Sequence, residues 1–144
     1  MKRFFVVTVA TALVLVCSSQ HLLAQRPWYR GNVRETIKQL ETDTDSFKSS
    51  LDRALDHSTL NGTRTEDEIN GYVKNFEEAT DRLRDRAEDR DYAPGLAREV
   101  LNRGRAINAF MTSHRLGKDA ETDWARVRSD LNRLANGYNL RWRW

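Results

Sequence analysis

The feature that most constrains the fold of this chain is an apolar stripe that recurs at alternating intervals of four and three residues. The first stripe consists of Val33, Ile37, Leu40, Thr44, Phe47, Leu51, Ala54 and Ser58. Similar stripes run through residues 69–87 and 120–138, and a less regular one runs through residues 96–111. Because this spacing places all members of a stripe on one face of an α-helix, it predicts four amphipathic helices.

Local signals predict where these helices begin and end. Pro27 and Gly31 favour an extended or turned segment, after which Asn32 is expected to cap the first helix. Thr65 is expected to cap the second helix, with Glu68 completing a Thr-x-x-Glu capping box. The predicted helices cover about residues 32–57, 65–90, 94–115 and 118–137, followed by an extended aromatic tail over residues 138–144.

The short connections between the helices constrain the topology. Helices joined by short loops run antiparallel to their neighbours, and seams with a repeat near 3.5 residues favour small crossing angles. We therefore predict an all-α, up-down-up-down antiparallel four-helix bundle. A three-helix core with one peripheral helix is the alternative.

The N-terminal residues 1–24 have the layout of a secretory signal peptide. Lys2 and Arg3 precede a mostly apolar run, which gives way to small and polar residues. The run is shorter than the roughly 20 residues of a membrane-spanning helix. We predict cleavage after residue 24 or 25, a mature helical domain over residues 25–144, and a secreted or periplasmic location, with bacterial export favoured.

Cys17 is the only cysteine in the sequence and allows a different interpretation of the signal. Val14 to Cys17 resembles the lipobox of bacterial lipoproteins, in which the cysteine is lipidated. The residue before the cysteine is small in that motif, whereas this chain has Val16. Cleavage after residue 24 instead leaves a mature chain without cysteine, which has no disulfide and no thiolate site.

Aromatic residues gather at both ends of the predicted bundle domain. In an up-down bundle the start of the first helix and the end of the fourth lie at the same end. We expect an aromatic pole there, formed by Trp28, Tyr29, Tyr138, Leu140, Arg141, Trp142, Arg143 and Trp144. One interpretation is a lid over the open end of the core. The other is an exposed Arg/Trp segment that binds anionic lipid head groups, because Trp favours the membrane interface and Arg attracts phosphates.

Two histidines are the weak candidates for a metal site. His57 and His114 each end a predicted helix at the opposite end of the bundle, where carboxylates of other helices begin. Histidine with carboxylates can bind zinc or copper. However, no H-x-x-x-H or E-x-x-H pair is present. A histidine at a helix C-terminus also complements the helix dipole, so we predict no metal and no cofactor.

Polar residues also stand near the middle of the predicted helices. Thr44 and Thr80 occupy stripe positions, and Arg103, Gly104 and Asn108 lie near the centre of the third helix. We expect a polar layer with a close helix contact that fixes the register of the bundle. A small polar cavity for a ligand is the alternative.

The charge pattern argues against a nucleic-acid partner. Loss of Lys2 and Arg3 lowers the formal charge from +3 to +1. Residues 66–91 carry ten acidic and five basic residues, whereas residues 98–115 carry four Arg and one Glu. We expect such opposite segments to be neighbouring helices rather than a surface for polyanions.

No catalytic arrangement is recognisable, so the sequence predicts a non-enzymatic protein. Serine nucleophile elbows, phosphate-binding glycine loops and H-E-x-x-H are absent from the sequence. The leading hypothesis is a secreted or periplasmic bundle that acts by protein–protein interaction, or as a structural component of the envelope, with an unknown envelope protein as partner. The alternatives are a peripheral binder of anionic membranes and a bundle that binds a metal or small ligand.

Overall fold

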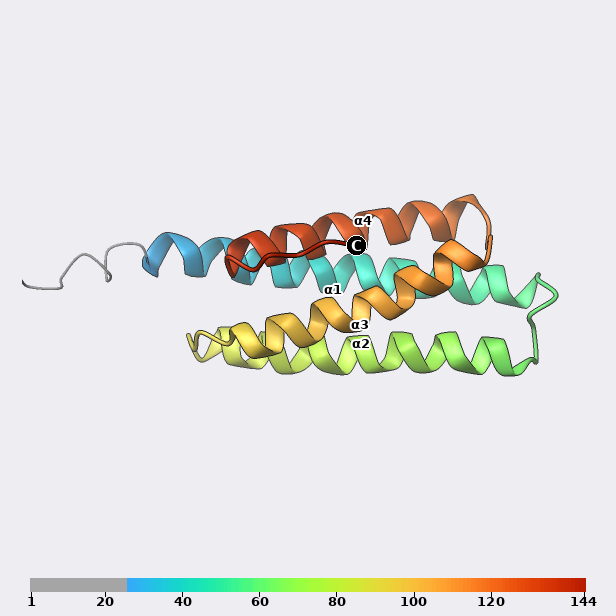
Figure 1. The fold of residues 1–144 in the computed structure, drawn as a ribbon, viewed down its shortest axis with the longest axis horizontal. Helices are drawn as coiled ribbons and strands as arrows, with labels where there is room; N and C mark the ends of the chain where they lie inside the picture. The colour runs from blue at the N-terminus through green and yellow to red at the C-terminus, as the bar shows by residue number, and fades with distance from the viewer. Residues whose placement is uncertain (1–25) are drawn as a thin grey trace, which may run out of the picture.

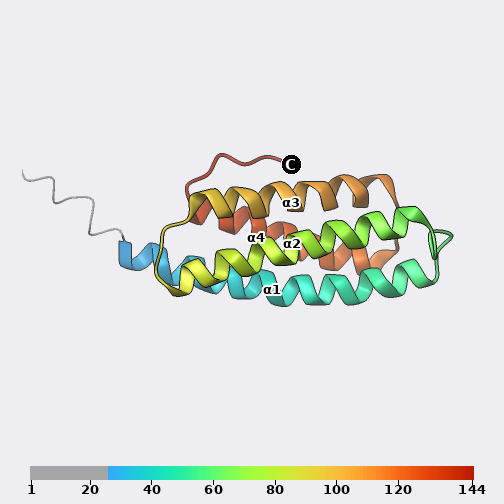
Figure 2. The ribbon, with the colours of Figure 1, turned by 90° about the horizontal axis from the view of Figure 1, so that it is seen from below.

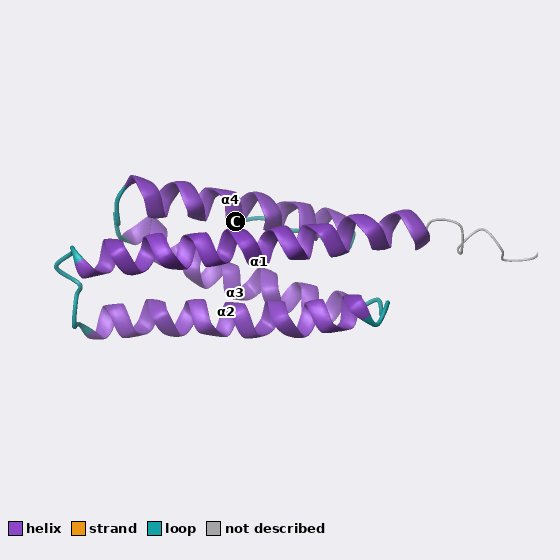
Figure 3. Cartoon of the chain, turned by 180° about the vertical axis from the view of Figure 1, so that it is seen from behind, coloured by secondary structure: helices purple, strands orange, loops and turns teal. Residues whose placement is uncertain are grey.

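Four helices make up the described part of this chain. The computed structural model describes the backbone of residues 26–144 and the side chains from residue 32 onward. The helices are α1 (Arg26–Asp56), α2 (Arg64–Glu88), α3 (Pro94–Ser113) and α4 (Lys118–Gly137). No strand occurs within residues 26–144 (Figure 3), which confirms the all-α prediction. The proposed signal peptide and Cys17 lie outside the described residues.

The helices form an antiparallel bundle in chain order. α1 packs most extensively against α4, and α2 packs most extensively against α3. Contacts between α1 and α2 and between α3 and α4 complete the ring (Figures 1 and 2). The predicted four-helix bundle is therefore confirmed. α1 and α2 form one side of the bundle, and α3 and α4 form the other. None of the described helices is long and apolar enough to cross a bilayer.

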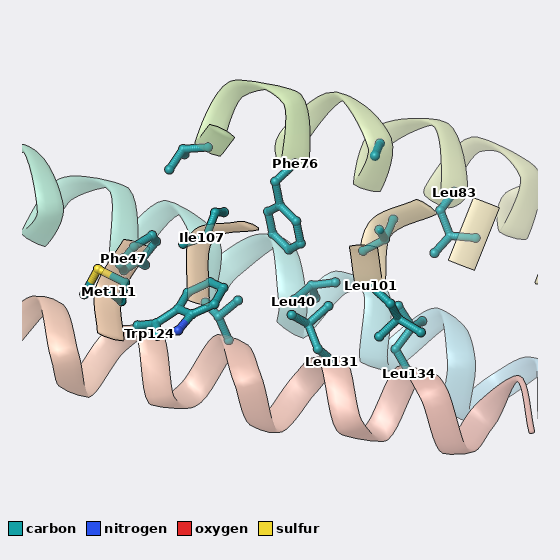
Figure 4. Close-up of a cluster of buried hydrophobic side chains, with 14 of the residues drawn as sticks. Leu40, Phe47, Phe76, Leu83, Leu101, Ile107, Met111, Trp124, Leu131 and Leu134 are labelled. Carbon is teal, nitrogen blue, oxygen red and sulfur yellow. The ribbon is translucent and has the colours of Figure 1, made fainter. Parts of the chain in front are cut away.

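The predicted stripes become the hydrophobic core. Phe47, Phe76 and Leu131 are completely buried, each from a different helix. Figure 4 shows Phe76 of α2 pointing toward Leu40 of α1 and Leu131 of α4. Burial of these apolar side chains is the main force that holds the four helices together.

The first helix begins earlier than predicted. Residues 26–31 are helical rather than extended, so Asn32 lies inside α1 and is not its cap. Its carbonyl oxygen accepts a hydrogen bond of 2.7 Å from the Thr36 hydroxyl. Pro27 is the second residue of the helix, where its missing N–H costs nothing and its fixed φ suits the first turn. The proline therefore initiates this helix instead of interrupting it.

The N-cap of α2 lies two residues before its predicted position. Thr63, not Thr65, is the N-cap, and its hydroxyl accepts from the Glu66 N–H at 3.4 Å. Glu66 in turn accepts from the Gly62 N–H at 2.6 Å. Gly62 has a φ of +71°, a conformation that glycine adopts without steric cost. This turn shifts the N-cap of the helix to Thr63, and the Glu66 side chain reaches the backbone of Gly62 rather than that of Thr63, whose N–H donates to the Leu60 carbonyl.

The middle of the bundle contains the predicted polar layer and close helix contact. The Thr44 and Thr80 hydroxyls donate to carbonyls of their own helices, at 2.6 Å and 3.0 Å. Gly104 of α3 is buried, and a Cβ atom added to it would lie 2.6 Å from Leu131 Cδ1 of α4. Asn108 accepts a 3.1 Å hydrogen bond from the indole N–H of Trp124. Arg103 instead lies on the surface, paired with Glu99.

The chain reverses direction directly after α4. Asn139 has a φ of +53°, a left-handed conformation that asparagine tolerates better than most residues. The Leu140 N–H donates to the Ala135 carbonyl at 2.8 Å, the bond that closes a Schellman motif. The tail, residues 138–144, then runs back along the outer side of α3 and α4 to about the middle of the bundle (Figures 1 and 2).

Candidate functional site

The tail lies on α3 and α4 with alternate side chains facing the bundle. Tyr138 is buried, and Leu140 and Trp142 are half-buried against the core. Arg141 and Arg143, which alternate with them, are exposed. In an extended segment successive side chains point to opposite sides. The period of two seen in the sequence thus separates contacts with the bundle from groups that face solvent.

Two tyrosines hold the start of the tail at the end of the bundle. Tyr92, in the loop between α2 and α3, stacks on Tyr138 with ring centroids 5.6 Å apart. Its hydroxyl donates to the Tyr138 carbonyl at 3.4 Å. Burial raises the pKa of the Tyr138 hydroxyl to about 12, with a smaller contribution from Tyr92. The Tyr138 side chain is therefore uncharged at neutral pH and belongs to the core.

Arg105 of α3 holds the middle of the tail. Its guanidinium carbon lies 4.2 Å from the centroid of the Trp142 ring, within the range of a cation–π interaction. The same guanidinium donates from Nη2 to the Arg143 carbonyl at 2.7 Å. One side chain therefore contacts both an aromatic face and the backbone of the tail.

Three groups on α4 hold the far part of the tail, through Trp144. The indole N–H of Trp144 donates to Asn132 Oδ1 at 3.1 Å. Arg128 lies over the Trp144 ring at 5.2 Å, and the ring of Trp124 meets it edge-on at 6.3 Å. Trp142 makes a second edge contact with it at 5.5 Å. Trp144 nevertheless remains 36% exposed, so its indole is both anchored and accessible.

The predicted aromatic lid is wrong for residues 140–144. These residues leave the end of the bundle and lie along its side, because the left-handed Asn139 turns the chain back. The side chains of Trp28 and Tyr29 lie outside the described residues. Tyr138 does lie at the bundle end, and its partner there is Tyr92. The sequence offered no periodic signal for Tyr92, which belongs to a loop.

Charge is divided between the two sides of the bundle. Residues 26–93, which contain α1 and α2, carry twelve basic and sixteen acidic residues. Residues 94–144, which contain α3, α4 and the tail, carry ten basic and five acidic residues. α2 and α3 pack against each other, which confirms that the acidic segment 66–91 and the basic segment 98–115 lie on neighbouring helices. However, the ion pair between them, Arg82–Glu99 at 2.7 Å, joins a basic residue of the acidic helix to an acidic residue of the basic helix.

A charged groove lies between α1 and α2, on the side away from the tail. It has a volume of about 610 Å³ and is open to solvent. Its lining residues are Glu41, Thr44, Asp45, Lys74, Glu77, Glu78, Thr80, Asp81 and Arg84. Arg84 bridges the groove to Glu41 at 2.8 Å, and burial raises the pKa of Glu41. Lys48 pairs with Glu77 at 3.0 Å, so internal ion pairs occupy much of this polar surface.

The two candidate metal ligands make bonds within their own helices. His57 Nδ1 lies 2.7 Å from the Arg53 carbonyl, and its side chain is exposed. His114 Nδ1 lies 3.1 Å from the Phe110 carbonyl, and its ring stacks on the Phe110 ring at 4.2 Å. Among the described residues, no three His, Cys, Asp or Glu side chains converge as a metal site would require. Both histidines are thus placed as helix C-terminal residues.

Comparisons with protein-family models, with curated proteins and with solved structures found no match for this chain. The geometry and charge of the described residues are therefore what bears on its function.

Proposed function

We propose that this protein is a non-enzymatic, exported helical bundle that acts by protein–protein interaction in the cell envelope. Its binding surface is the tail face, which we define as Arg105, Arg128, Asn132 and residues 140–144. The proposed export rests on the signal-like residues 1–24. The docked tail supports the proposal most directly, because it presents partly exposed indoles beside four guanidinium groups, two on the tail and two on α3 and α4.

The chemistry of the tail face favours a protein partner with an acidic surface. Arg and Trp are enriched in protein interfaces and account for many of the residues that dominate binding energy. Trp144 is 36% exposed, while Asn132 and Arg128 hold its ring in one orientation. A side chain held in place before binding loses less conformational entropy in the complex. Arg141 and Arg143 point away from the bundle and supply the charge that would face an acidic partner.

Site-specific photo-crosslinking in the source cells tests this proposal. An Arg143→p-benzoylphenylalanine variant is expected to form one discrete covalent adduct in the envelope fraction, because position 143 is exposed within the tail face. An Asp52→p-benzoylphenylalanine variant is the matched control, since Asp52 is also exposed but lies on α1, away from the tail. It is expected to give no such adduct.

A second substitution tests whether the adduct depends on the tail face. Adding an Arg128→Glu substitution to the crosslinking variant should abolish the adduct, because it reverses a charge beside Trp144. Equal adducts from positions 143 and 52, or none from position 143 in cells that export the protein, would contradict the proposal. Fractionation of the same cells tests the export itself.

An anionic membrane surface is the second candidate partner, because Arg141 and Arg143 both face solvent next to the exposed indole of Trp144. On this hypothesis the protein should bind vesicles containing phosphatidylglycerol and not vesicles of phosphatidylcholine alone. Each arginine near such a surface contributes about 1 kcal/mol, so Arg141→Ala with Arg143→Ala should weaken partitioning about 30-fold.

Vesicle co-sedimentation measures this difference. Arg34→Ala with Arg53→Ala removes the same charge from exposed positions of α1 and should leave partitioning nearly unchanged. Binding that is equal for both double variants, or insensitive to salt, would exclude the membrane interpretation.

A further inference from the structure

A carboxyl group is buried in the α1–α4 seam, the surface along which these two helices pack. Asp130 of α4 is 0% exposed, and it is the only carboxylic residue in the buried set of the described chain. Its neighbours along α4, Val127 and Leu134, are core residues with 0% exposure. A charged carboxylate in such a place is costly unless all its oxygens have partners.

Only one oxygen of Asp130 has a donor among the described residues. Oδ1 accepts a hydrogen bond from Arg133, one turn further along α4. Oδ2 is buried and receives no hydrogen bond from any described donor. The carboxyl of Asp43 on α1 lies within hydrogen-bonding reach of the Asp130 carboxyl. Two carboxyl groups can bond to each other only when one of them carries a proton.

The other elements packed against α4 contribute no charge at this point. α3 meets α4 through Gly104 against Leu131 and through Asn108 against Trp124. The tail meets α4 through Asn132, Trp124 and Arg128, and the Arg105 guanidinium of α3 also contacts the tail. The charged groups that face Asp130 are therefore Asp43 from α1 and Arg133 from α4.

We propose that Asp43 and Asp130 share one proton across the α1–α4 seam, and that loss of this proton loosens the seam. With the proton present, one carboxyl donates to the other and Arg133 balances the remaining negative charge. Without it, the buried carboxylate of Asp130 faces the half-buried carboxylate of Asp43, and a single guanidinium cannot neutralise both. The pair then acts as a proton-binding site that couples helix packing to pH.

The electrostatics agree with this geometry. Burial, acting against the Arg133 guanidinium and together with the nearby Asp43, raises the pKa of Asp130 to about 6. Because this pKa lies above the ordinary value of 3.8, the folded protein holds the proton more tightly than the unfolded chain does. The stabilisation is therefore complete below about pH 4, declines between about pH 4 and pH 6, and is lost above that range.

Carboxyl ¹³C NMR of the whole protein tests the shared proton directly. Asp130 is expected to titrate with a midpoint near 6. Asp43→Asn should lower that midpoint by about one unit, because it removes the facing negative charge. Asp52→Asn, which removes a charge from an exposed position of α1, should leave it unchanged. An Asp130 midpoint near 4, or one insensitive to Asp43→Asn, would overturn the proposal.

The pH dependence of unfolding tests whether the proton controls the seam. From this group alone, the unfolding equilibrium constant of the unmodified protein should rise about 100-fold between pH 4 and pH 8. Asp130→Asn keeps the shape of the side chain and cannot ionise, so that contribution should disappear while Asp52→Asn retains it. If Asp130→Asn proves unstable, Asp43→Asn should reduce the same contribution. Identical pH profiles for the unmodified protein and Asp130→Asn would contradict the coupling.

Discussion

Deleting residues 140–144 is expected to lower the melting temperature of the protein by about 10 °C. The deletion removes the two edge contacts of Trp144, two cation–π contacts and three hydrogen bonds to the bundle. Together these contributions amount to about 3 kcal/mol. In a domain of this size, each 1 kcal/mol shifts the melting temperature by several degrees. Thermal unfolding followed by circular dichroism measures the change.

The matched control changes the tail without undocking it. Arg141→Ala with Arg143→Ala truncates the two outward side chains and keeps the Arg143 carbonyl that accepts from Arg105. This double variant should melt within about 2 °C of the unmodified protein, because exposed side chains contribute little to stability. An equally stable deletion variant would show that the tail does not contribute to the fold, and the tail face would then have no fixed geometry.

Substituting Gly104 with leucine is expected to lower the free energy of unfolding by about 3 kcal/mol. Even a single Cβ at this position would lie 2.6 Å from Leu131 Cδ1 and 3.5 Å from Phe76 Cε2. Leu131 and Phe76 are both fully buried, so a leucine forces α3 away from α4. Chemical denaturation measures the loss. Because Arg105 follows Gly104 directly, the same displacement should increase the solvent exposure of Trp142 in fluorescence quenching.

Gly71→Leu provides a control with the opposite sign. Gly71 lies inside α2, and a Cβ atom added there would meet nothing within 4 Å. Replacing a helical glycine with leucine where space is free should raise the free energy of unfolding by about 0.7 kcal/mol. If Gly104→Leu were as stable as the unmodified protein, the close α3–α4 contact would not be a constraint on the bundle.

The arrangement of the four helices was predictable because apolar periodicity is read directly from the sequence. Helix ends depended on local conformations that the periodicity does not encode. Pro27 served as a helix initiator rather than a breaker, and Gly62 moved the cap of α2 to Thr63. The backbone preferences of Pro27 and Gly62 are each compatible with two local structures, and the neighbouring turn determines which of the two forms.

The site was predictable only in part. The period of two in the tail correctly separated Leu140 and Trp142 from the arginines. Its direction was not predictable, because it follows from the left-handed conformation of one residue, Asn139. Tyr92 lies 46 positions before Tyr138 in a loop without periodicity, so their stacking follows only from the folded bundle.

The spacing of Asp43 and Asp130 relative to the apolar residues was a sequence signal for their burial, but aspartate is normally expected at the surface. Asp43 stands three residues after Leu40 and four before Phe47, and Asp130 stands in the same relation to Val127 and Leu134. These are intervals of the core-facing stripe. Charged residues at such positions are usually assigned to a solvent-facing helix surface, since Asp is rarely buried. An acidic residue at matching intervals on two packed helices is the pattern that distinguishes this case.

The division of charge across the bundle makes the molecule an electric dipole. The part with α1 and α2 has a formal net charge of −4, and the part with α3, α4 and the tail has +5. Because both parts extend along the full length of the helices, the dipole axis runs across the bundle rather than along it. Near any negatively charged object the molecule therefore experiences a torque that rotates its tryptophan-bearing side forward. Long-range orientation thus precedes contact, and its effect on association rates should fade as ionic strength rises.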